Sequence, residues 1–227
     1  MNILYEDEAI IVCEKEAGVA TQTKQFGQKD MESLLKNYLV MKGERPYIGI
    51  VHRLDQPVSG VMVFAKTKEA AADLSRQVAT KSADKYYYAV TDGIPADSTN
   101  PLSKSVVLED YLLRDGKANL SKVVDKGTEG AKRAELSYQI LEQKNNQAIL
   151  RIKLETGRHH QIRVQLSHAN MPLLGDTKYG NEESCKVSQA MAIRQTALLA
   201  SRLVLQHPRT GEELSFEVPF PSKWCIN

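Results

Sequence analysis

The feature that most constrains the fold is a strict alternation of apolar and polar residues that begins at Arg133. The alternating apolar residues are Ala134, Leu136, Tyr138, Ile140, Ala148, Leu150, Ile152 and Leu154. A period of two places successive side chains on opposite faces of a strand. The pair Asn145-Asn146 separates the two runs and favours a tight turn. The segment is therefore predicted to form an antiparallel hairpin with one buried face.

Other apolar runs predict further elements along the chain. Expected strands cover Ala9–Val12, Val61–Ala65, Lys85–Val90, Leu203–Gln206 and Leu214–Val218. Apolar residues at three-and-four spacing predict one helix behind Asp30 as its N-cap and a second around Ala71, Leu74 and Val78. The forty residues after Asp92-Gly93 show no regular pattern before the alternation begins. Strands outnumber helices and mostly follow one another, which favours an antiparallel sheet.

No internal repeat, low-complexity tract or linker divides the sequence. A chain of 227 residues with 42% hydrophobic content can bury a sizeable core. We therefore expect a single α+β domain over residues 1–227, built on a mostly antiparallel mixed sheet flanked by helices and loops.

The charge distribution does not decide whether the protein binds a nucleic acid. Net charge is only +2, but Arg114–Arg133 holds six Lys/Arg against three Asp/Glu, and Arg151–His168 holds four against one. Two such stretches could bind phosphates, or they could be ordinary solvated faces. No apolar run approaches the ~18 residues of a membrane span, and the acidic residues near the N-terminus do not fit a signal peptide. We expect a cytoplasmic protein without membrane association.

The three cysteines are Cys13, Cys185 and Cys225. They are odd in number, far apart and without C-x-x-C spacing, so neither a disulfide framework nor a zinc knuckle is indicated. They are expected to be reduced, structural thiols.

Three segments carry candidate chemistry. Asp55 lies in His52–Gly60, a loop beside a buried strand, where a carboxylate can be held rigidly and still face a ligand. Arg163 lies one step off an apolar helical face formed by Ile162, Leu166 and Ala169, near the boundary between core and solvent. Tyr87 is the middle of three tyrosines and points to the opposite face of its strand from its neighbours.

Each segment also has an ordinary structural interpretation. Asp55 could cap a turn with Arg53 as its salt partner, and the Arg163 segment could be a surface helix. A tyrosine in a strand usually packs against its neighbours.

Together, the segments resemble the RluA-type pseudouridine synthase family over nearly the whole chain. Asp7–Gly18 is similar to the opening strand and turn of the family, with Glu16 where proline is usual. His52–Asp55 with Ser59-Gly60 resembles the signature loop, and Gly157–Val164 resembles a second diagnostic motif. The tail with Phe216, Pro219 and Pro221 also matches. Val58, His159 and Gln165 depart from the usual residues, which affects expected substrate contacts rather than chemistry.

The resemblance implies an isomerase that converts uridine to pseudouridine in structured RNA, either rRNA or tRNA. It assigns Asp55 as the essential carboxylate, Tyr87 as the active-site tyrosine and Arg163 as the ion-pair partner of Asp55. The residues expected to contact RNA are His52, Arg53, Arg158, His160 and Gln161. No cofactor, metal or obligatory protein partner is implied, and we expect a monomer without a separate N-terminal RNA-binding domain.

Three other functions share single features with this sequence. His52–Asp55 superficially resembles a kinase H-R-D loop, but Leu54 intervenes and neither a G-x-G-x-x-G loop nor D-F-G is present. A metal-dependent hydrolase would need ligands such as His52, His159, His160 and Asp176, which lack a recognised spacing. A catalytically silent RNA-binding protein remains the third alternative.

Overall fold

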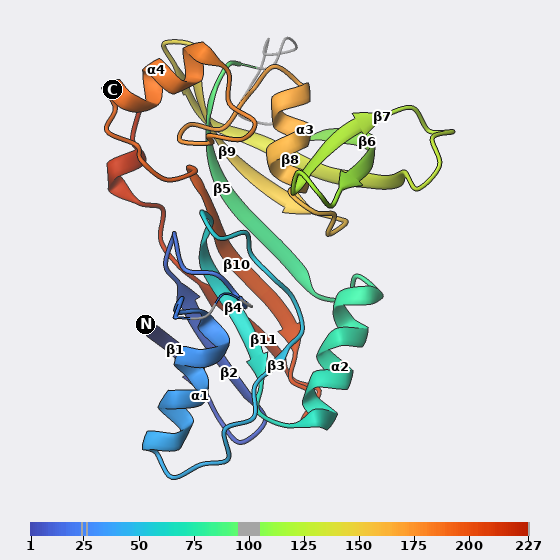
Figure 1. The fold of residues 1–227 in the computed structure, drawn as a ribbon, viewed down its shortest axis with the longest axis vertical. Coiled ribbons are helices and arrows are strands. Elements are labelled where there is room, and N and C mark those ends of the chain that lie inside the picture. Colours follow the sequence, from blue (N-terminus) through green and yellow to red (C-terminus); the bar gives the residue numbers. More distant parts are fainter. Residues whose placement is uncertain (24, 26, 95–104, 227) are drawn as a thin grey trace. The chain divides into compact units, whose positions relative to one another are not determined.

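The computed structural model describes residues 1–23, 25, 27–94 and 105–226 (Figure 1). The chain forms two compact units. Unit 1 comprises Met1–Asp84 and Ala200–Pro219, and unit 2 comprises Lys85–Leu199 and Phe220–Asn227. Each unit is described by itself.

Unit 1 combines an antiparallel sheet with two helices. Its strands are β1 (Asn2–Glu6), β2 (Ile10–Lys15), β3 (Gly49–Ile50), β4 (Ser59–Ala65), most of β10 (Leu198–Gln206) and β11 (Glu213–Glu217). The strand order is β1-β2-β4-β10, with β3 added to β4 and β11 added to β10. The antiparallel register of β2 and β4 places Lys15 opposite Gly60, at the end of the loop that carries Asp55.

Both helices of unit 1 begin where a side chain caps them. Helix α1 (Met31–Met41) starts after Asp30, whose carboxylate accepts a hydrogen bond from the backbone N–H of Ser33. Helix α2 (Lys68–Ala79) starts after Thr67 and packs against β3 and β4. Such caps satisfy backbone donors that the first turn leaves unpaired.

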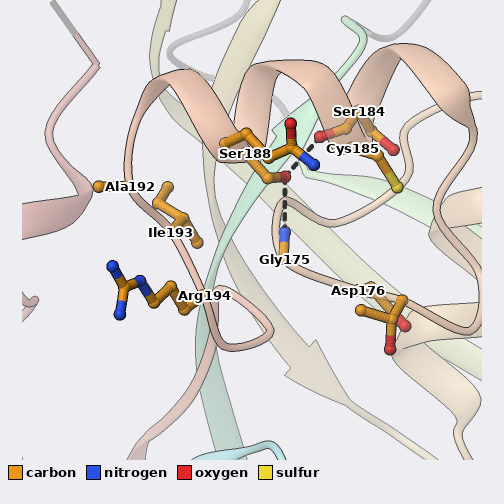
Figure 2. Close-up of a pocket in the computed structure, with 10 residues that line it drawn as sticks. Gly175, Asp176, Ser184, Cys185, Ser188, Ala192, Ile193 and Arg194 are labelled. Carbon is orange, nitrogen blue, oxygen red and sulfur yellow. Dashed lines mark hydrogen bonds between the residues drawn. The ribbon is translucent and has the colours of Figure 1, made fainter.

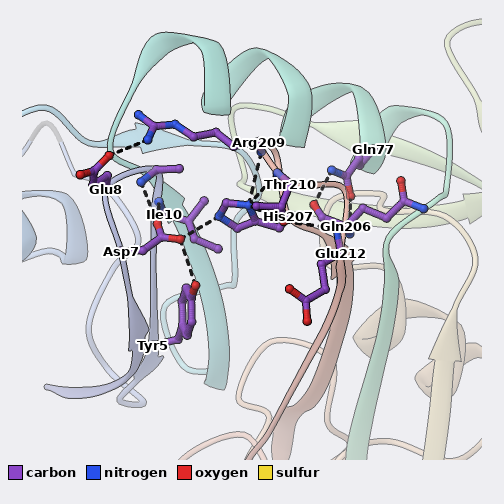
Figure 3. Close-up of polar contacts among 11 residues, drawn as sticks. Tyr5, Asp7, Glu8, Ile10, Gln77, Gln206, His207, Arg209, Thr210 and Glu212 are labelled. Carbon is purple, nitrogen blue, oxygen red and sulfur yellow. Dashed lines mark hydrogen bonds and ion pairs between the residues drawn. The ribbon is translucent and has the colours of Figure 1, made fainter.

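A histidine clamp joins the β1–β2 turn to the β10–β11 turn (Figure 3). The buried His207 contacts the Asp7 carboxylate through Nε2 at 2.8 Å, and its Nδ1 accepts the backbone N–H of Thr210 at 3.1 Å. Asp7 also accepts the Tyr5 hydroxyl at 2.9 Å. The contact between Asp7 and His207 connects residues 200 positions apart and fixes the two turns against each other.

Unit 2 contains five strands that pair antiparallel with one another, and helices. Its elements are β5 (Asp84–Asp92), β6 (Val106–Asp115), β7 (Leu120–Val124), β8 (Lys132–Lys144), β9 (Gln147–Leu154), α3 (Gln161–His168), α4 (Glu182–Ala190) and the short 3-10 helix Ser222–Trp224. The strand order is β5-β9-β8-β6-β7. Helix α3 packs against β6 and β7, and its Val164 joins Leu112 and Ala134 in a buried cluster.

The hairpin predicted from alternation is confirmed as β8 and β9. Asn145 and Asn146 both adopt left-handed backbone angles, with φ of 50° and 62°, as a tight two-residue turn requires. Ala134, Leu136, Tyr138 and Ile140 are all buried, so one face of β8 is apolar as expected.

The other predicted strands and helices are also present, and the α+β class with antiparallel pairing is confirmed. Strands β1 and β3, the β6–β7 pair, helix α4 and the 3-10 helix were missed. The expectation of irregular structure before Arg133 was wrong for β6 and β7, because these strands carry charges and no clean alternation. Residues 95–104 of that stretch lie outside the described part of the chain. The single-domain assignment of residues 1–227 stays a prediction.

Within the described residues, none of the helices is long and apolar enough to span a membrane. The three cysteines are free thiols. Cys13 is buried, but Cys185 and Cys225 are exposed, so the description as structural thiols holds only for Cys13.

Candidate functional site

The loop that carries Asp55 is held by the segment that follows β2. Thr21 donates its hydroxyl to the carbonyl of Leu54 at 3.0 Å and accepts the Leu54 N–H at 3.3 Å. The N–H of Val58 donates to the carbonyl of Asp55 and closes a turn. Leu54 and Val58 are buried, whereas Asp55 between them is partly exposed. The carboxylate is therefore positioned by a fixed backbone and remains accessible.

A buried lysine beneath this loop was missed as a site residue. Lys15 has no exposed surface, and its ammonium donates to the carbonyls of Glu16, Val19 and Gln56 at 2.7–3.1 Å. Burial lowers the pKa of Lys15 to about 8, while the negative charge of Asp55 acts in the opposite direction. Its charge at the end of the mostly apolar strand Ile10–Lys15 was the signal available in the sequence. Lys15 ties the loop to β2 and places a cation near Asp55.

The predicted RNA-contact residues of unit 1 lie on the same loop. The Nε2 atom of His52 accepts the backbone N–H of Val63 at 3.1 Å, so the ring is anchored to β4. Arg53 is exposed and donates to the side-chain oxygen of Gln22 at 2.9 Å. Unit 1 thus brings His52, Arg53 and Asp55 onto one loop.

The alternation predicted for the three tyrosines is confirmed in β5. Tyr87 is buried, and its partner across the ladder is the buried Ile152. Tyr86 lies under the cationic groups of Arg151 and Lys153, at 5.7 and 5.9 Å from the ring centre. Tyr87 therefore points away from the face that carries these charges.

Arg163 is more deeply buried than expected. Only 3% of its side chain is exposed, and every position from Gln161 to Leu166 of α3 is buried. The placement at the boundary between core and solvent was wrong, since Asp176 and Tyr179 lie against the Arg163 guanidinium. The predicted pairing of Arg163 with Asp55 stays a prediction.

The structure gives Arg163 a carboxylate partner that the sequence interpretation missed. Its Nε and a terminal nitrogen donate to the two oxygens of Asp176, both at 2.7 Å. Burial acts to raise the pKa of Asp176, but the hydrogen bonds and charge of Arg163 outweigh it and lower the pKa below its usual value. A two-point pair of this kind fixes the guanidinium plane. The spacing of 13 residues across a loop gave no periodic signal.

Asp176 also organises the loop that follows it. Its Oδ1 accepts the N–H groups of Lys178 and Tyr179 at 3.0 and 3.2 Å. The Tyr179 ring centre lies 5.1 Å from the Arg163 guanidinium, and the Tyr179 hydroxyl is 2.7 Å from Nδ1 of His160. Arg163 is thus enclosed by a carboxylate on one side and an aromatic ring on another.

His160 and Gln161 begin α3 in an unusual way. His160 caps the helix in a left-handed conformation, with φ of 54°, and stacks on His159 at 3.7 Å between ring centres. A left-handed conformation costs a non-glycine residue on the order of 1–2 kcal/mol. Gln161 is buried and bonds with Thr156, Gln165 and backbone groups. Arg158 is exposed, and its Nε donates to the carbonyl of Arg133.

Asp176 also lines a pocket of about 480 Å³ (Figure 2). Helix α4 and the segments around Gly175 and Ile193 line it, together with the exposed Cys185. Ser188 accepts the N–H of Gly175 at 2.8 Å and holds that turn against α4. Gly175 has a positive φ of 71°, and a Cβ there would lie 2.1 Å from the Gln195 carbonyl, so glycine is required.

The proposed metal ligands do not form a cluster. In residues 1–23, 25, 27–94 and 105–226, no group of three His, Cys, Asp or Glu side chains is arranged to hold a metal ion. His159 contacts Ser121 and Asn119 through its two nitrogens, and Asp176 is bound by Arg163.

Comparisons with known proteins agree on one family. Residues 9–168 match the family described as RNA pseudouridylate synthase. The chain is 36% identical over 98% of its length to Ribosomal large subunit pseudouridine synthase D of Neisseria meningitidis serogroup B, and it covers 59% of that protein. It is 35% identical over its full length to the protein of the same name from Pseudomonas aeruginosa, covering 71%.

The fold has a counterpart among solved structures. Human RNA Pseudouridylate Synthase Domain Containing 4 matches with a TM-score of 0.78 at 24% identity, covering 98% of this chain and 90% of that one. This likeness concerns the fold alone. The chain spans less than two thirds of the Neisseria relative's length.

Proposed function

Because the chain belongs to the RNA pseudouridylate synthase family, we propose that it isomerises uridine to pseudouridine in large-subunit ribosomal RNA. The RNA class follows the printed names of its relatives. The structural observation that carries the proposal is Asp55 on a loop pinned by Thr21 and the buried Lys15. Such a loop holds a carboxylate in one place while leaving it open to a substrate.

The reaction is balanced without an external reactant. The bond between the ribose carbon C1′ and N1 of uracil breaks, the base turns, and C1′ bonds to C5. The proton that leaves C5 is replaced by one gained at N1. Asp55 either attacks the sugar or the base, or removes a proton from the sugar, and each role needs its ionised form.

Arg163 and Tyr87 complete the proposed catalytic set. A cation within ~4 to 6 Å of a carboxylate favours the ionised form, and an arginine stays charged at any relevant pH. The Asp176 pair and the Tyr179 ring fix the guanidinium of Arg163 in advance. Tyr87 would offer a ring for the flipped uracil and a hydroxyl for proton transfer.

The remaining assigned residues would bind RNA. Arg53 and Arg158 are exposed and charged, which suits phosphate contacts. His52 and His160 lie beside them in sequence and are anchored by Val63 and Tyr179. Gln161 has both side-chain polar atoms bonded within unit 2, so its contribution would be to shape the Arg158 turn. A target uridine must leave its stack at a cost of a few kcal/mol, which loops and bulges in RNA reduce.

The rest of the proposal concerns the whole protein. We propose one catalytic domain over residues 1–227, acting as a monomer in the cytoplasm without a cofactor. Transfer RNA is the alternative substrate, and a silent RNA-binding protein is the alternative function.

The decisive experiment maps pseudouridine in total RNA from cells with and without the gene, and from cells that carry Asp55→Asn. We expect one or more large-subunit rRNA positions to lose pseudouridine in both mutant strains. The Asn variant keeps the shape of the side chain and removes only its charge, so RNA binding should persist while turnover falls at least about a hundredfold. Pseudouridine lost only from tRNA would change the substrate, and an unchanged map would refute the activity.

A further inference from the structure

A second lysine at the start of β5 has no role in the scheme above. Lys85 lies two residues before Tyr87, and residues two apart share one face of a strand. It is partly buried, whereas most lysines keep their charge in water.

The ammonium of Lys85 lies beside a glycine of the second diagnostic motif. A Cβ built on Gly157 would lie 3.6 Å from the Lys85 ammonium, and among the described residues no other atom outside its chain neighbours comes within 4 Å. Gly157 does not have the positive φ that would by itself require glycine. Because glycine has no side chain, the space next to the Lys85 ammonium stays open at this position.

The ammonium of Lys85 has no countercharge in the described part of the chain. The other buried cations discussed above are matched, with Lys15 bound to three carbonyls and Arg163 bound to Asp176. Burial lowers the pKa of Lys85, and no carboxylate among the described residues raises it again. A partly desolvated charge without a partner is costly to the fold. A ligand that supplies a negative charge would offset that cost.

A second cation lies next to Gly157 in sequence. Arg158 follows Gly157 directly and is exposed, and its Nε donates to the backbone carbonyl of Arg133. RNA carries one phosphate per nucleotide, and lysine binds phosphate as a point charge.

We propose that Lys85 and the open turn at Gly157 form a binding site for a backbone phosphate of the RNA substrate. This site deepens the proposed function and rests on it. Lys85 binds the phosphate next to the nucleotide that reaches Tyr87, and so positions the substrate without taking part in bond breaking. The unpaired ammonium destabilises the free protein slightly and stabilises the complex.

The test compares Lys85→Met, Lys85→Arg and the control Lys186→Met. Lys186 is an exposed lysine of α4 paired with Glu182, so its loss removes the same charge elsewhere on unit 2. Binding to protein-free large-subunit rRNA is measured across a range of salt concentrations, and melting temperature is measured without RNA. We expect Lys85→Met to bind roughly tenfold more weakly, with a salt slope smaller by about one, and to melt no lower than wild type.

The arginine variant tests the charge itself. Lys85→Arg keeps the positive charge, so at pH 7 it should bind with an affinity and a salt slope close to those of wild type, and as the pH rises it should lose less affinity than wild type. The control should match wild type in salt slope. An unchanged slope in Lys85→Met, or a lower melting temperature in both Lys85 variants with no change of slope, would overturn the phosphate site.

The same RNA separates the site from the proposed function. Pseudouridine formation by wild type is measured in parallel with binding. If wild type forms pseudouridine but the salt slope of binding is the same in wild type and Lys85→Met, only the phosphate site is refuted. If the slope differs between them but wild type forms no pseudouridine, the isomerase activity is refuted and the phosphate site is retained. If wild type binds no RNA, both are overturned.

Discussion

At the scale of single residues, the negative charge of Asp55 affects the pKa of Lys15. Lys15 is buried under the loop, and its pKa of about 8 reflects burial opposed by the Asp55 charge. The lysine holds the loop backbone through three carbonyls, so its state of protonation bears on the position of Asp55.

Asp55→Asn should therefore lower the pKa of Lys15 below about 8, because the change removes the favourable negative charge and leaves the burial. Titration of the labelled Lys15 side chain by NMR measures the shift. Asp73→Asn on α2, which faces Arg76 and Gln77, serves as the control and should leave Lys15 unchanged. Equal pKa values for Lys15 in the Asp55→Asn variant and in wild type would show that the two charges do not interact.

Asp176 is the second residue on which the site depends. Asp176→Asn removes one charge of a buried two-point pair, so we expect a loss of about 3–5 kcal/mol in the free energy of unfolding, measured by urea denaturation at pH 7. Glu182→Gln breaks the exposed pair with Lys186 and should cost less than about 1 kcal/mol. A small effect at Asp176 would mean that Arg163 is held by its other contacts.

At the scale of elements, Gly60 allows β4 to approach β10. A Cβ at Gly60 would lie 2.2 Å from the carbonyl oxygen of Ala200, and the backbone has a positive φ of 126°. Gly18, in the turn after β2, also has a positive φ, of 92°, but nothing lies within 4 Å of its Cβ position. A side chain at Gly18 would therefore meet backbone strain alone, whereas a side chain at Gly60 would meet both strain and a steric clash.

Gly18→Ala should cost about 1–2 kcal/mol of unfolding free energy from strain alone. Gly60→Ala should cost considerably more, because β4 and β10 must move apart, and the loop with Asp55 should shift with them. Thermal melting and pseudouridine formation measure the two effects. Equal losses in the two variants would show that the close contact at Gly60 relaxes freely.

At the scale of the whole molecule, Glu6 contributes to stability because its carboxylate joins β1 to the segments that carry α1 and β4. The carboxylate accepts hydrogen bonds from Lys42 after α1, Lys66 after β4, and Tyr38. Burial acts to raise the pKa of Glu6, but these three bonds outweigh it and lower the pKa to about 2.

Because the folded pKa of Glu6 lies below the unfolded value of 4.5, its contribution is fully present above pH 4.5 and is lost as the pH falls toward 2. The contribution is on the order of 2–3 kcal/mol. Glu6→Gln should lower the unfolding free energy at pH 7 and flatten its decline between pH 4.5 and 2, measured by urea denaturation. The exposed Glu182→Gln is the control, and a decline as steep as that of wild type in Glu6→Gln would contradict this account.

Local pattern was sufficient for much of the protein. The β8–β9 hairpin, the capped start of α1, the buried strand β4 and the α+β class all follow from hydrophobic periodicity and turn residues, which act within a few positions of one another. The family was recognised from motif residues that need no structure to read, and it is confirmed. Asp55, Tyr87 and Arg163 were chosen as site residues on the same basis.

Tertiary structure decided what those residues contact. Sequence periodicity placed Arg163 at a surface boundary, but its side chain is buried, and Asp176 and Tyr179 of a later loop lie against its guanidinium. The sequence analysis chose neither Lys15 nor Lys85 as a site residue. Only the packing of the described residues around them shows that Lys15 is fully bonded and that Lys85 is without a countercharge. Burial and pairing depend on chain segments distant in sequence, so no local pattern can specify them.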